Sequence, residues 1–172
     1  MEKIKAHITG EIISSNTSVA HALYQKSRFG EIVGDKIQYS LPEALFLIEK
    51  KKMELFSRSK LVPKKDLIRK FRRIDKKIQI KYAVYKDLRE RGYIVKTALK
   101  FGAEFRVYDK GIKPGKKHAK WIVFTDHESK RLTWHEFSAK NRVAHSTKKN
   151  LLLAIVDEEG AITYYEVSWV KP

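Results

Sequence analysis

The sequence contains no cysteine and no long run of apolar residues. Without cysteine, the chain can form neither disulfide bonds nor thiolate metal sites, which fits a reducing compartment. A transmembrane helix needs about 20 consecutive, mostly apolar residues, and no segment approaches that length. Residues 1–10 are charged from Glu2 onward and lack the apolar core of a signal peptide. We therefore expect a soluble, cytoplasmic protein with no membrane partner.

Basic residues far outnumber acidic ones. The chain has 37 lysines and arginines against 20 aspartates and glutamates, which gives a formal net charge of +17. The basic residues are spread over both halves of the chain rather than collected in a tail. Such an excess favours a polyanionic partner, usually nucleic acid, because each phosphate that a cation neutralises releases counterions. The alternative is a solvated basic surface of the kind found on thermophilic or ribosome-associated proteins.

Residues 1–77 have the pattern of a small N-terminal mixed α/β domain without catalytic motifs. We expect strands at residues 3–13, 36–39 and 53–56 and helices at residues 16–25, 41–51 and 63–74. The second helix opens with a capping box formed by Ser40 and Glu43. The third carries lysines and arginines on its outer face, which are either solvated or a surface for RNA or another subunit. His7 and His21 lack partners at metal-ligand spacing, so we predict structural roles for both.

Residues 78–172 also alternate between helical and strand patterns. A helix over residues 75–91 ends at Gly92, because a glycine readily adopts the left-handed conformation that terminates helices. A second capping box, from Thr133 to Glu136, begins a helix that extends to about residue 141. We expect strands at residues 93–99, 104–108, 119–125, 151–156 and 162–170. The fold class is therefore α/β (α+β), with a second domain that starts at residue 78 and no flexible linker before it.

Three side chains in the second half have chemistry suited to RNA cleavage: Tyr108, His118 and Lys149. RNA carries its own nucleophile, the 2′-hydroxyl, so cleavage needs a base, an acid for the leaving 5′-oxygen and a cation for the added negative charge. A phenol is a poor base unless nearby cations stabilise its phenolate, and Lys149, Lys116 or Lys117 could do so. From spacing alone these three residues could equally be a packed tyrosine, a polar loop residue and a surface lysine.

The second half closely resembles archaeal tRNA-splicing endonucleases, the tRNA-intron endonucleases, of the short homotetrameric type. The matching motifs keep their order and their loop lengths. They are YIVK at residues 93–96, Phe101-Gly102, Arg106-Val107-Tyr108, Pro114-Gly115, HAKW at residues 118–121 and RVAHSTKK at residues 142–149, followed by LLLAIVD and YYEVSWVKP. The match spans roughly residues 78–172, and the N-terminal half is similar to the family's small α/β domain in length and layout.

The resemblance implies a restriction-nuclease-like catalytic domain with a central mixed sheet at residues 78–172. The N-terminal domain at residues 1–77 would support assembly and RNA binding. The implied enzyme is an endoribonuclease that excises introns from precursor tRNA by cutting both strands at a bulge–helix–bulge motif. The resemblance makes Tyr108 the general base, His118 the general acid and Lys149 the transition-state stabiliser. No metal or other cofactor is expected, and the products would be a 2′,3′-cyclic phosphate and a 5′-hydroxyl.

The resemblance also implies residues for substrate binding and assembly. Arg142 matches one arginine of a clamp that holds a bulge base, and Trp169 is the candidate for the second plane because indole stacks well on bases. The acidic hairpin of Asp157, Glu158 and Glu159 would insert into a basic cleft of a neighbouring subunit in a homotetramer. Without the family resemblance, the same hairpin is an ordinary solvated turn.

Two ambiguities concern the last motif of the second half. The register of that motif selects Lys149 over Lys148 as the catalytic lysine. His145 in the same motif could position the turn of that lysine, and we assign it no catalytic role.

Two other function classes stay open at this point. A metal-dependent DNA nuclease would use the same restriction-like fold, but it needs clustered carboxylates to hold Mg²⁺. Glu104, Asp109 and Asp126 do not form the expected paired motif. A non-catalytic RNA-binding or structural subunit would be expected to have a broken set of catalytic residues, and here the set is intact.

Overall fold

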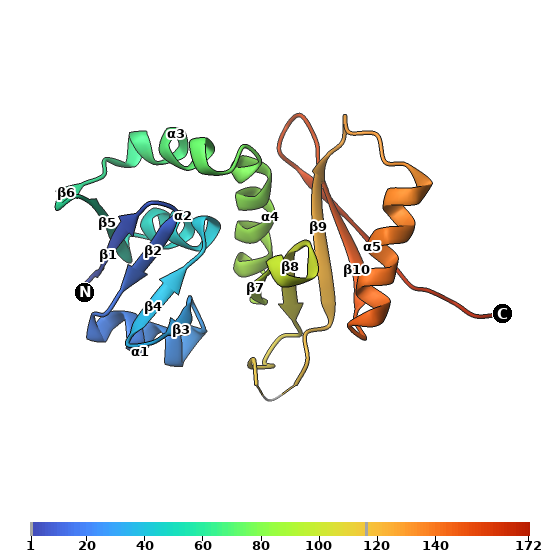
Figure 1. Ribbon diagram of the computed structural model, residues 1–172, viewed down its shortest axis with the longest axis horizontal. Coiled ribbons are helices and arrows are strands. Elements are labelled where there is room, and N and C mark those ends of the chain that lie inside the picture. Colours follow the sequence, from blue (N-terminus) through green and yellow to red (C-terminus); the bar gives the residue numbers. More distant parts are fainter. Residues whose placement is uncertain (1, 116) are drawn as a thin grey trace. The chain divides into compact units, whose positions relative to one another are not determined.

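The computed structural model describes residues 2–115 and 117–172, and its contacts divide the chain into two compact units between Tyr82 and Ala83 (Figure 1). Each unit is built on one mixed sheet with helices packed on it, which confirms the predicted α+β class. The division falls within α4 (Ile78–Glu90), a helix that is continuous across it. The boundary expected at residues 77 and 78 stays a prediction. None of the helices in the described ranges is long and apolar enough to cross a bilayer.

The first unit contains a six-stranded sheet in the order β3-β4-β2-β1-β5-β6. Its strands are β1 (Ile4–Thr9), β2 (Ile12–Ser15), β3 (Glu31–Val33), β4 (Lys36–Tyr39), β5 (Met53–Ser57) and β6 (Lys60–Leu61). β1 and β5 are parallel, and the other neighbouring pairs are antiparallel. β3 and β6 were not expected from the sequence. Both are short edge strands, which carry too few residues to show an alternating pattern.

Three helices accompany this sheet: α1 (Ser18–Ser27), α2 (Leu41–Glu49) and α3 (Lys64–Ile74). The predicted capping box of α2 is confirmed, since the Ser40 hydroxyl accepts from the Glu43 amide and the Glu43 carboxylate accepts from the Ser40 amide. The helix expected at residues 16–25 has Ser15 and Asn16 as candidate caps in the sequence, and neither caps α1. The Thr17 hydroxyl accepts from the Ala20 amide instead, because the Ser15 hydroxyl donates to the Lys5 carbonyl within the sheet.

The second unit contains a five-stranded sheet in the order β11-β10-β9-β8-β7. Its strands are β7 (Ile94–Ala98), β8 (Ala103–Tyr108), β9 (Trp121–His127), β10 (Asn150–Val156) and β11 (Ile162–Val167), and a short 3-10 turn, η1 (Leu99–Phe101), precedes β8. β9 and β10 are parallel, and the remaining pairs are antiparallel. α5 (Trp134–Ser146) provides the connection between the two parallel strands. This arrangement is the central mixed sheet that the resemblance implied.

Helices cover both faces of this second sheet (Figure 1). On one face, Ala144 of α5 packs in a core cluster with Ile122 and Leu151. On the other, Tyr85 of α4 lies 5.8 Å from Phe105, measured between ring centroids. The site described below lies on the α5 face.

Two element ends in this unit differ from expectation. α5 continues to Ser146 rather than ending near residue 141, because the following residues include neither glycine nor proline and Ala144 is part of the core. β11 ends at Val167 rather than at residue 170, because Leu151, the partner of Val167, is almost the first residue of β10. Trp169 therefore lies beyond the strand.

Candidate active site

Tyr108, His118 and Lys149 all belong to one end of the second sheet. Tyr108 is the last residue of β8, Lys149 immediately precedes β10, and His118 lies in the loop that leads into β9. The Lys120 amide donates to the Val107 carbonyl at 2.9 Å, and the Asn150 amide donates to the Lys120 carbonyl at 2.9 Å. Because neighbouring strands lie about 4.8 Å apart, the backbones at Tyr108 and Lys149 are separated by about 10 Å, with Lys120 between them.

Tyr108 and Lys149 also point to the same face of the sheet, the one that α5 covers. Arg106 and Leu151 are both paired with Ile122, which lies in the core under α5. Side chains two residues apart on a strand share a face. Tyr108 therefore lies on the same face as Arg106, and Lys149 lies on the same face as Leu151. The Lys149 Nζ atom lies 5.7 Å from the ring centroid of Phe101, which packs against this same core.

Lys149 is held in a half-buried, electropositive position. Its Nζ donates to the Thr147 carbonyl at 2.7 Å. Burial lowers the pKa of Lys149 below its ordinary value, and the positive charges of Arg106 and Lys100 lower that pKa further. Both neighbours repel the ammonium, so an incoming phosphate would relieve a repulsion that is already present. Lys148, the alternative in the sequence, is exposed and has a left-handed backbone with a φ of 54°.

His118 is exposed and lies in an open hollow of about 430 Å³. The described residues that line it include five more with polar or charged groups: Tyr93, Asp109, Lys110, Lys117 and Lys120. Lys120 is held by Asp109 at 3.9 Å and by the face of Trp121, 4.3 Å from its ring centroid. A hollow with one imidazole and several ammonium groups suits a phosphate group. Lys116, which the sequence analysis named beside Lys117, lies outside the described residues.

Tyr108 is the most enclosed of the three residues, with 5% of its surface exposed. It lines neither the hollow around His118 nor the hollow around Lys149 described next. The structure thus brings the three residues to one sheet end but places their side chains in different surroundings. Tyr108 is covered, His118 is open to solvent and Lys149 is intermediate.

A second hollow, of about 200 Å³, contains Lys149 together with Trp169 and His145. The rings of His145 and Trp169 lie 4.4 Å apart. Trp169 is 62% exposed, so a large part of its indole is open to a stacking partner. Arg142 is exposed on α5 and does not line this hollow. Of the two residues expected to hold a base, Trp169 therefore lies beside Lys149, and Arg142 lies one helical turn before His145.

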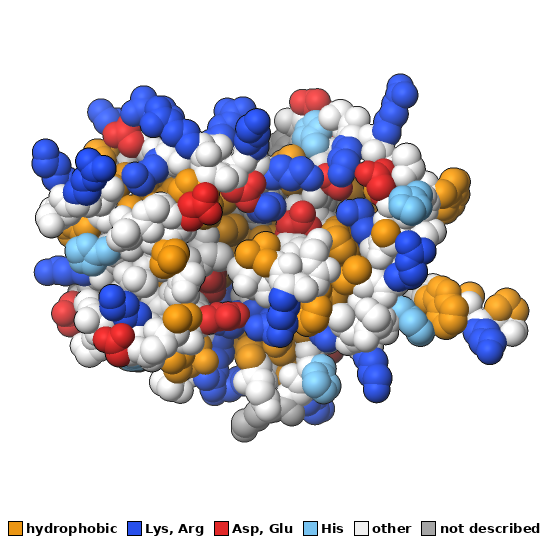
Figure 2. All heavy atoms as spheres, in the orientation of Figure 1, with side chains coloured by type: hydrophobic (Ala, Val, Ile, Leu, Met, Phe, Trp, Pro, Cys, Tyr) orange, Lys and Arg blue, Asp and Glu red, His pale blue; other side chains and the backbone are white. Residues whose placement is uncertain are grey.

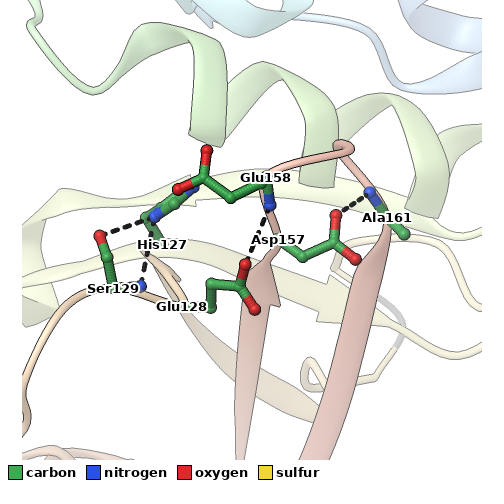
Figure 3. Close-up of polar contacts among 6 residues, drawn as sticks. All are labelled: His127, Glu128, Ser129, Asp157, Glu158 and Ala161. Atoms are coloured by element: carbon green, nitrogen blue, oxygen red, sulfur yellow. Dashed lines mark hydrogen bonds and ion pairs between the residues drawn. The ribbon is translucent and has the colours of Figure 1, made fainter.

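The acidic hairpin between β10 and β11 is held by a polar contact within the turn and by contacts to residues at the end of β9 (Figure 3). The Asp157 carboxylate accepts from the Ala161 amide at 2.7 Å, and the Glu158 amide donates to the Glu128 carboxylate at 3.1 Å. The Glu158 carboxylate lies 3.9 Å from the His127 imidazole. Asp157 therefore shapes the turn, while the side chains of Glu158 and Glu159 are exposed.

Sequence reasoning missed three basic residues that surround the site: Lys100, Arg106 and Lys120. Arg106 could have been found, because it precedes Tyr108 by two residues in a predicted strand and so must share its face. The turn between β7 and β8 brings Lys100 near Lys149. Strand pairing brings the backbone of Lys120 beside Asn150, the residue after Lys149. Neither relationship is visible in sequence spacing.

The three carboxylates considered for metal binding have separate protein contacts. Glu104 accepts from the Thr125 amide at 3.1 Å, Asp126 pairs with Lys130 at 3.2 Å, and Asp109 lies 3.9 Å from Lys120. Across residues 2–115 and 117–172, no group of three histidine, cysteine, aspartate or glutamate side chains has an arrangement that could hold a metal ion.

Comparison with known proteins gives matches in both units. The family model described as tRNA intron endonuclease, catalytic C-terminal domain, matches residues 78–164, and the model for the N-terminal domain of that family matches residues 5–68. Proteins named tRNA-splicing endonuclease from Pyrococcus horikoshii and Methanothermobacter thermautotrophicus are 41% and 39% identical. These alignments cover 98% and 99% of this chain and 97% and 99% of the relatives. One from Nanoarchaeum equitans is 42% identical over 82% of this chain and 94% of its own length.

Proposed function

The chain belongs to the tRNA intron endonuclease family and is an endoribonuclease that excises introns from precursor tRNA, and we propose that it cuts at a bulge–helix–bulge motif with Tyr108, His118 and Lys149. The observation that carries this assignment is the common sheet end. Backbone hydrogen bonds through Lys120 tie the end of β8 to the start of β10, and the His118 loop enters between them. Four cations, at Lys100, Arg106, Lys120 and Lys149, gather at this end or along the same face of the sheet.

In the proposed reaction, the 2′-hydroxyl beside the scissile bond attacks the phosphorus. The Tyr108 oxygen, as phenolate, takes the proton of that hydroxyl, and a new bond forms between the 2′-oxygen and phosphorus. The bond from phosphorus to the 5′-oxygen breaks, and the His118 imidazolium gives the leaving oxygen its proton. The products are a 2′,3′-cyclic phosphate and a 5′-hydroxyl, and no metal ion takes part.

Lys149 would act by charge alone. The five-coordinate phosphorus carries one more negative charge than the starting diester, and a fixed ammonium in a half-buried site stabilises that added charge more than it stabilises the substrate. The neighbouring Arg106 and Lys100 lower the pKa of Lys149 and also add to the positive potential.

Substrate recognition in this proposal uses Arg142 and Trp169 as the two planes around a bulge base. Trp169 has an exposed indole in the same hollow as Lys149, which supports its part. A substrate with two cut sites needs two active sites, and the family resemblance implies a homotetramer, which we propose is held in part by the exposed Glu158 and Glu159. A cytoplasmic location stays a prediction.

One assay tests the mechanism. A bulge–helix–bulge RNA is incubated with the protein in excess EDTA, beside the same RNA with 2′-deoxyribose at both cut sites. We expect full cleavage of the first RNA, with cyclic phosphate ends, and none of the second. If EDTA abolishes cleavage, a metal-dependent nuclease is favoured. Equal cutting of both RNAs would show that the 2′-hydroxyl is not the nucleophile.

A further inference from the structure

The outer face of α3 in the first unit is strongly basic. α3 buries Leu67 and Phe71, which are four residues apart and so lie on one side of the helix. The opposite side carries the exposed Lys65, Arg69, Arg72 and Arg73, and Lys64 and Lys70 flank the buried side. We call these six residues the α3 basic face. Figure 2 shows lysine and arginine side chains gathered over α3, at the upper left of the view.

This charge is almost entirely uncompensated within α3. The only acidic residue of the helix is Asp66, whose carboxylate pairs with Arg69 at 2.7 Å. The Arg69 side chain remains 72% exposed in that pair, so the guanidinium keeps most of its surface for another partner. An exposed pair of this kind contributes little to stability. Most of the positive charge of the α3 basic face therefore has no acidic partner within the helix.

The α3 basic face is also hollowed. One depression of about 280 Å³ is lined by residues from the β5–β6 hairpin, including Lys60 and Leu61, together with Arg69 and Arg73 of α3. Another, of about 440 Å³, is lined by Lys65, Ile68 and Arg72 with the same two arginines. Arg69 and Arg73 thus border both depressions. Cationic side chains line both depressions, so both can receive the phosphates of a polyanion.

We propose that the α3 basic face binds the phosphate backbone of a double-helical arm of the substrate RNA, away from the bulges that are cut. This inference rests on the proposed function only in taking precursor tRNA as the substrate. Lys65, Arg69 and Arg72 follow one another at spacings of four and three residues, so they form a stripe about 10 Å long. Guanidinium groups form paired hydrogen bonds with phosphate oxygens, and such contacts position RNA without reading its sequence.

The competing occupant is the acidic hairpin of a second copy of the chain. In that hairpin the Asp157 carboxylate accepts from the Ala161 amide, and the Glu158 carboxylate lies near His127. Two exposed glutamates cannot neutralise the six cations of the α3 basic face, whereas an RNA arm presents a continuous row of phosphates. The charge balance therefore favours RNA.

The test compares two variants with equal charge loss in the same unit. The first is Arg69→Gln, Arg72→Gln and Arg73→Gln, in which glutamine keeps a high helix propensity. The control is Lys5→Gln, Lys26→Gln and Lys36→Gln, at exposed positions away from α3. Binding is measured over a range of salt concentrations with a full precursor tRNA carrying 2′-deoxyribose at both cut sites, so that cleavage plays no part. The same measurements are made with a short bulge–helix–bulge RNA that lacks the tRNA arms.

We expect the arginine variant to bind the full precursor roughly tenfold to a hundredfold more weakly. The slope of the logarithm of its binding constant against the logarithm of the salt concentration should become less steep by about 2 to 3. Its binding and cleavage of the short RNA should be unchanged, and so should its mass in solution. The control should behave like the unchanged protein. Equal weakening in both variants, or no loss with the full precursor, overturns the proposal. A lower mass of the arginine variant would instead identify the face as a subunit contact.

The outcome separates this inference from the proposed cleavage. If the unchanged protein binds the precursor through the α3 basic face but cuts no RNA, the surface stands and the catalytic assignment fails. If it cuts the short RNA and the arginine variant binds the precursor normally, the cleavage stands and the surface assignment fails. If the unchanged protein does not bind the precursor, the surface assignment is also refuted.

Discussion

The imidazole of His145 and the indole of Trp169 lie 4.4 Å apart between centroids, with their planes inclined by 56°. His145 is in the last turn of α5, three residues after Arg142, whereas Trp169 follows the last strand of the sheet. Residues three apart on a helix are neighbours on its surface. Arg142 and Trp169, the two residues expected to hold a base, therefore flank the same imidazole. This contact gives His145 a neighbour, Trp169, that its place in the sequence motif did not reveal.

We predict that Trp169→Ala weakens RNA binding much more than it slows the chemical step. Stacking of one base on an aromatic side chain contributes about 1–3 kcal/mol, so the dissociation constant should rise by roughly 5-fold to 150-fold. Trp134→Ala is the matched control, because Trp134 is 82% exposed on α5 and its ring packs on Phe137 instead. Binding to an uncleavable bulge–helix–bulge RNA measures both. Equal losses in the two variants would refute a specific stacking role for Trp169.

His118→Ala should slow cleavage while leaving RNA binding nearly unchanged. General acid catalysis typically contributes about 10²–10⁴-fold, and the single-turnover rate should fall by that order. His135→Ala provides a control, since His135 is an exposed histidine in the first turn of α5. A substrate whose leaving 5′-oxygen is replaced by sulfur needs no proton donor, so it should restore the rate of His118→Ala. Loss of binding in this variant would assign His118 a structural role.

The pKa of Lys149 predicts how cleavage depends on alkaline pH. Lysine carries its charge below its pKa, and burial, Arg106 and Lys100 lower the pKa of Lys149. Its contribution should therefore be lost at a lower pH than an ordinary lysine would allow. Lys100→Gln removes one repelling charge and raises the pKa of Lys149, so the alkaline fall in rate should move to higher pH. Rates across an alkaline pH series measure this shift.

Lys148→Gln is the control for the pH series. Lys148 is exposed and is not among the charges that lower the pKa of Lys149. Its removal should leave the alkaline fall in place. If Lys100→Gln and Lys148→Gln give the same profile as the unchanged protein, the charge of Lys149 does not govern that fall.

Removing the exposed charges of the acidic hairpin should change the mass of the protein in solution. Asp157 forms the turn, so its replacement would disturb the fold of the loop. Glu158→Gln with Glu159→Gln removes only exposed charge, and we expect it to shift the proposed tetramer towards smaller species, most clearly at low salt. Glu11→Gln with Asp35→Asn removes the same charge from exposed positions in the first unit. Sedimentation measures the mass of each variant in solution. If both variants have the same mass as the unchanged protein, the docking role is contradicted.

Alanine should lower the stability of the protein more at Gly30 than at Gly34. Gly30 has a φ of 74°, and an added Cβ would overlap the Ile37 Cγ2 atom and lie 2.9 Å from the Gln38 carbonyl oxygen. Gly34 has a φ of 62° with open space around it. Alanine at either position costs roughly 1–2 kcal/mol for the left-handed backbone, and at Gly30 about 1–3 kcal/mol more for the overlap. Urea unfolding midpoints should therefore fall further for Gly30→Ala than for Gly34→Ala, and equal midpoints would contradict the overlap at Gly30.

Local signals in the sequence predicted the helices and the inner strands well. The capping boxes at Ser40 and Thr133 are formed as expected, because each needs only residues three positions apart. Family resemblance supplied the mixed sheet and the order of the motifs. The end of α5 was placed too early, because burial of Ala144 against the sheet extends the helix, and such packing is not a local property.

The site itself could be predicted only in part. Its three proposed catalytic residues were chosen from chemistry and motif order. The surroundings of Lys149 were not predicted, because Lys100 and Arg106 approach it across strand pairs and through a turn. The contact between His145 and Trp169 depends on where β11 ends, which in turn depends on the length of its partner strand. Relationships of this kind are set by pairing between segments far apart in the chain.

Because β9 and β10 pair in parallel, the geometry of the candidate site depends on the strand register that the chain reaches during folding. Trp121 is opposite Asn150, and the chain between them must cross the sheet through α5 before the two strands can meet. Such distant pairings form slowly compared with hairpins. A slip of one residue in this register would turn Lys149 towards the opposite face, away from Tyr108. The proposed catalytic set is therefore complete only in a chain that has folded in the correct register, and we expect a copy with slipped register to cut no RNA.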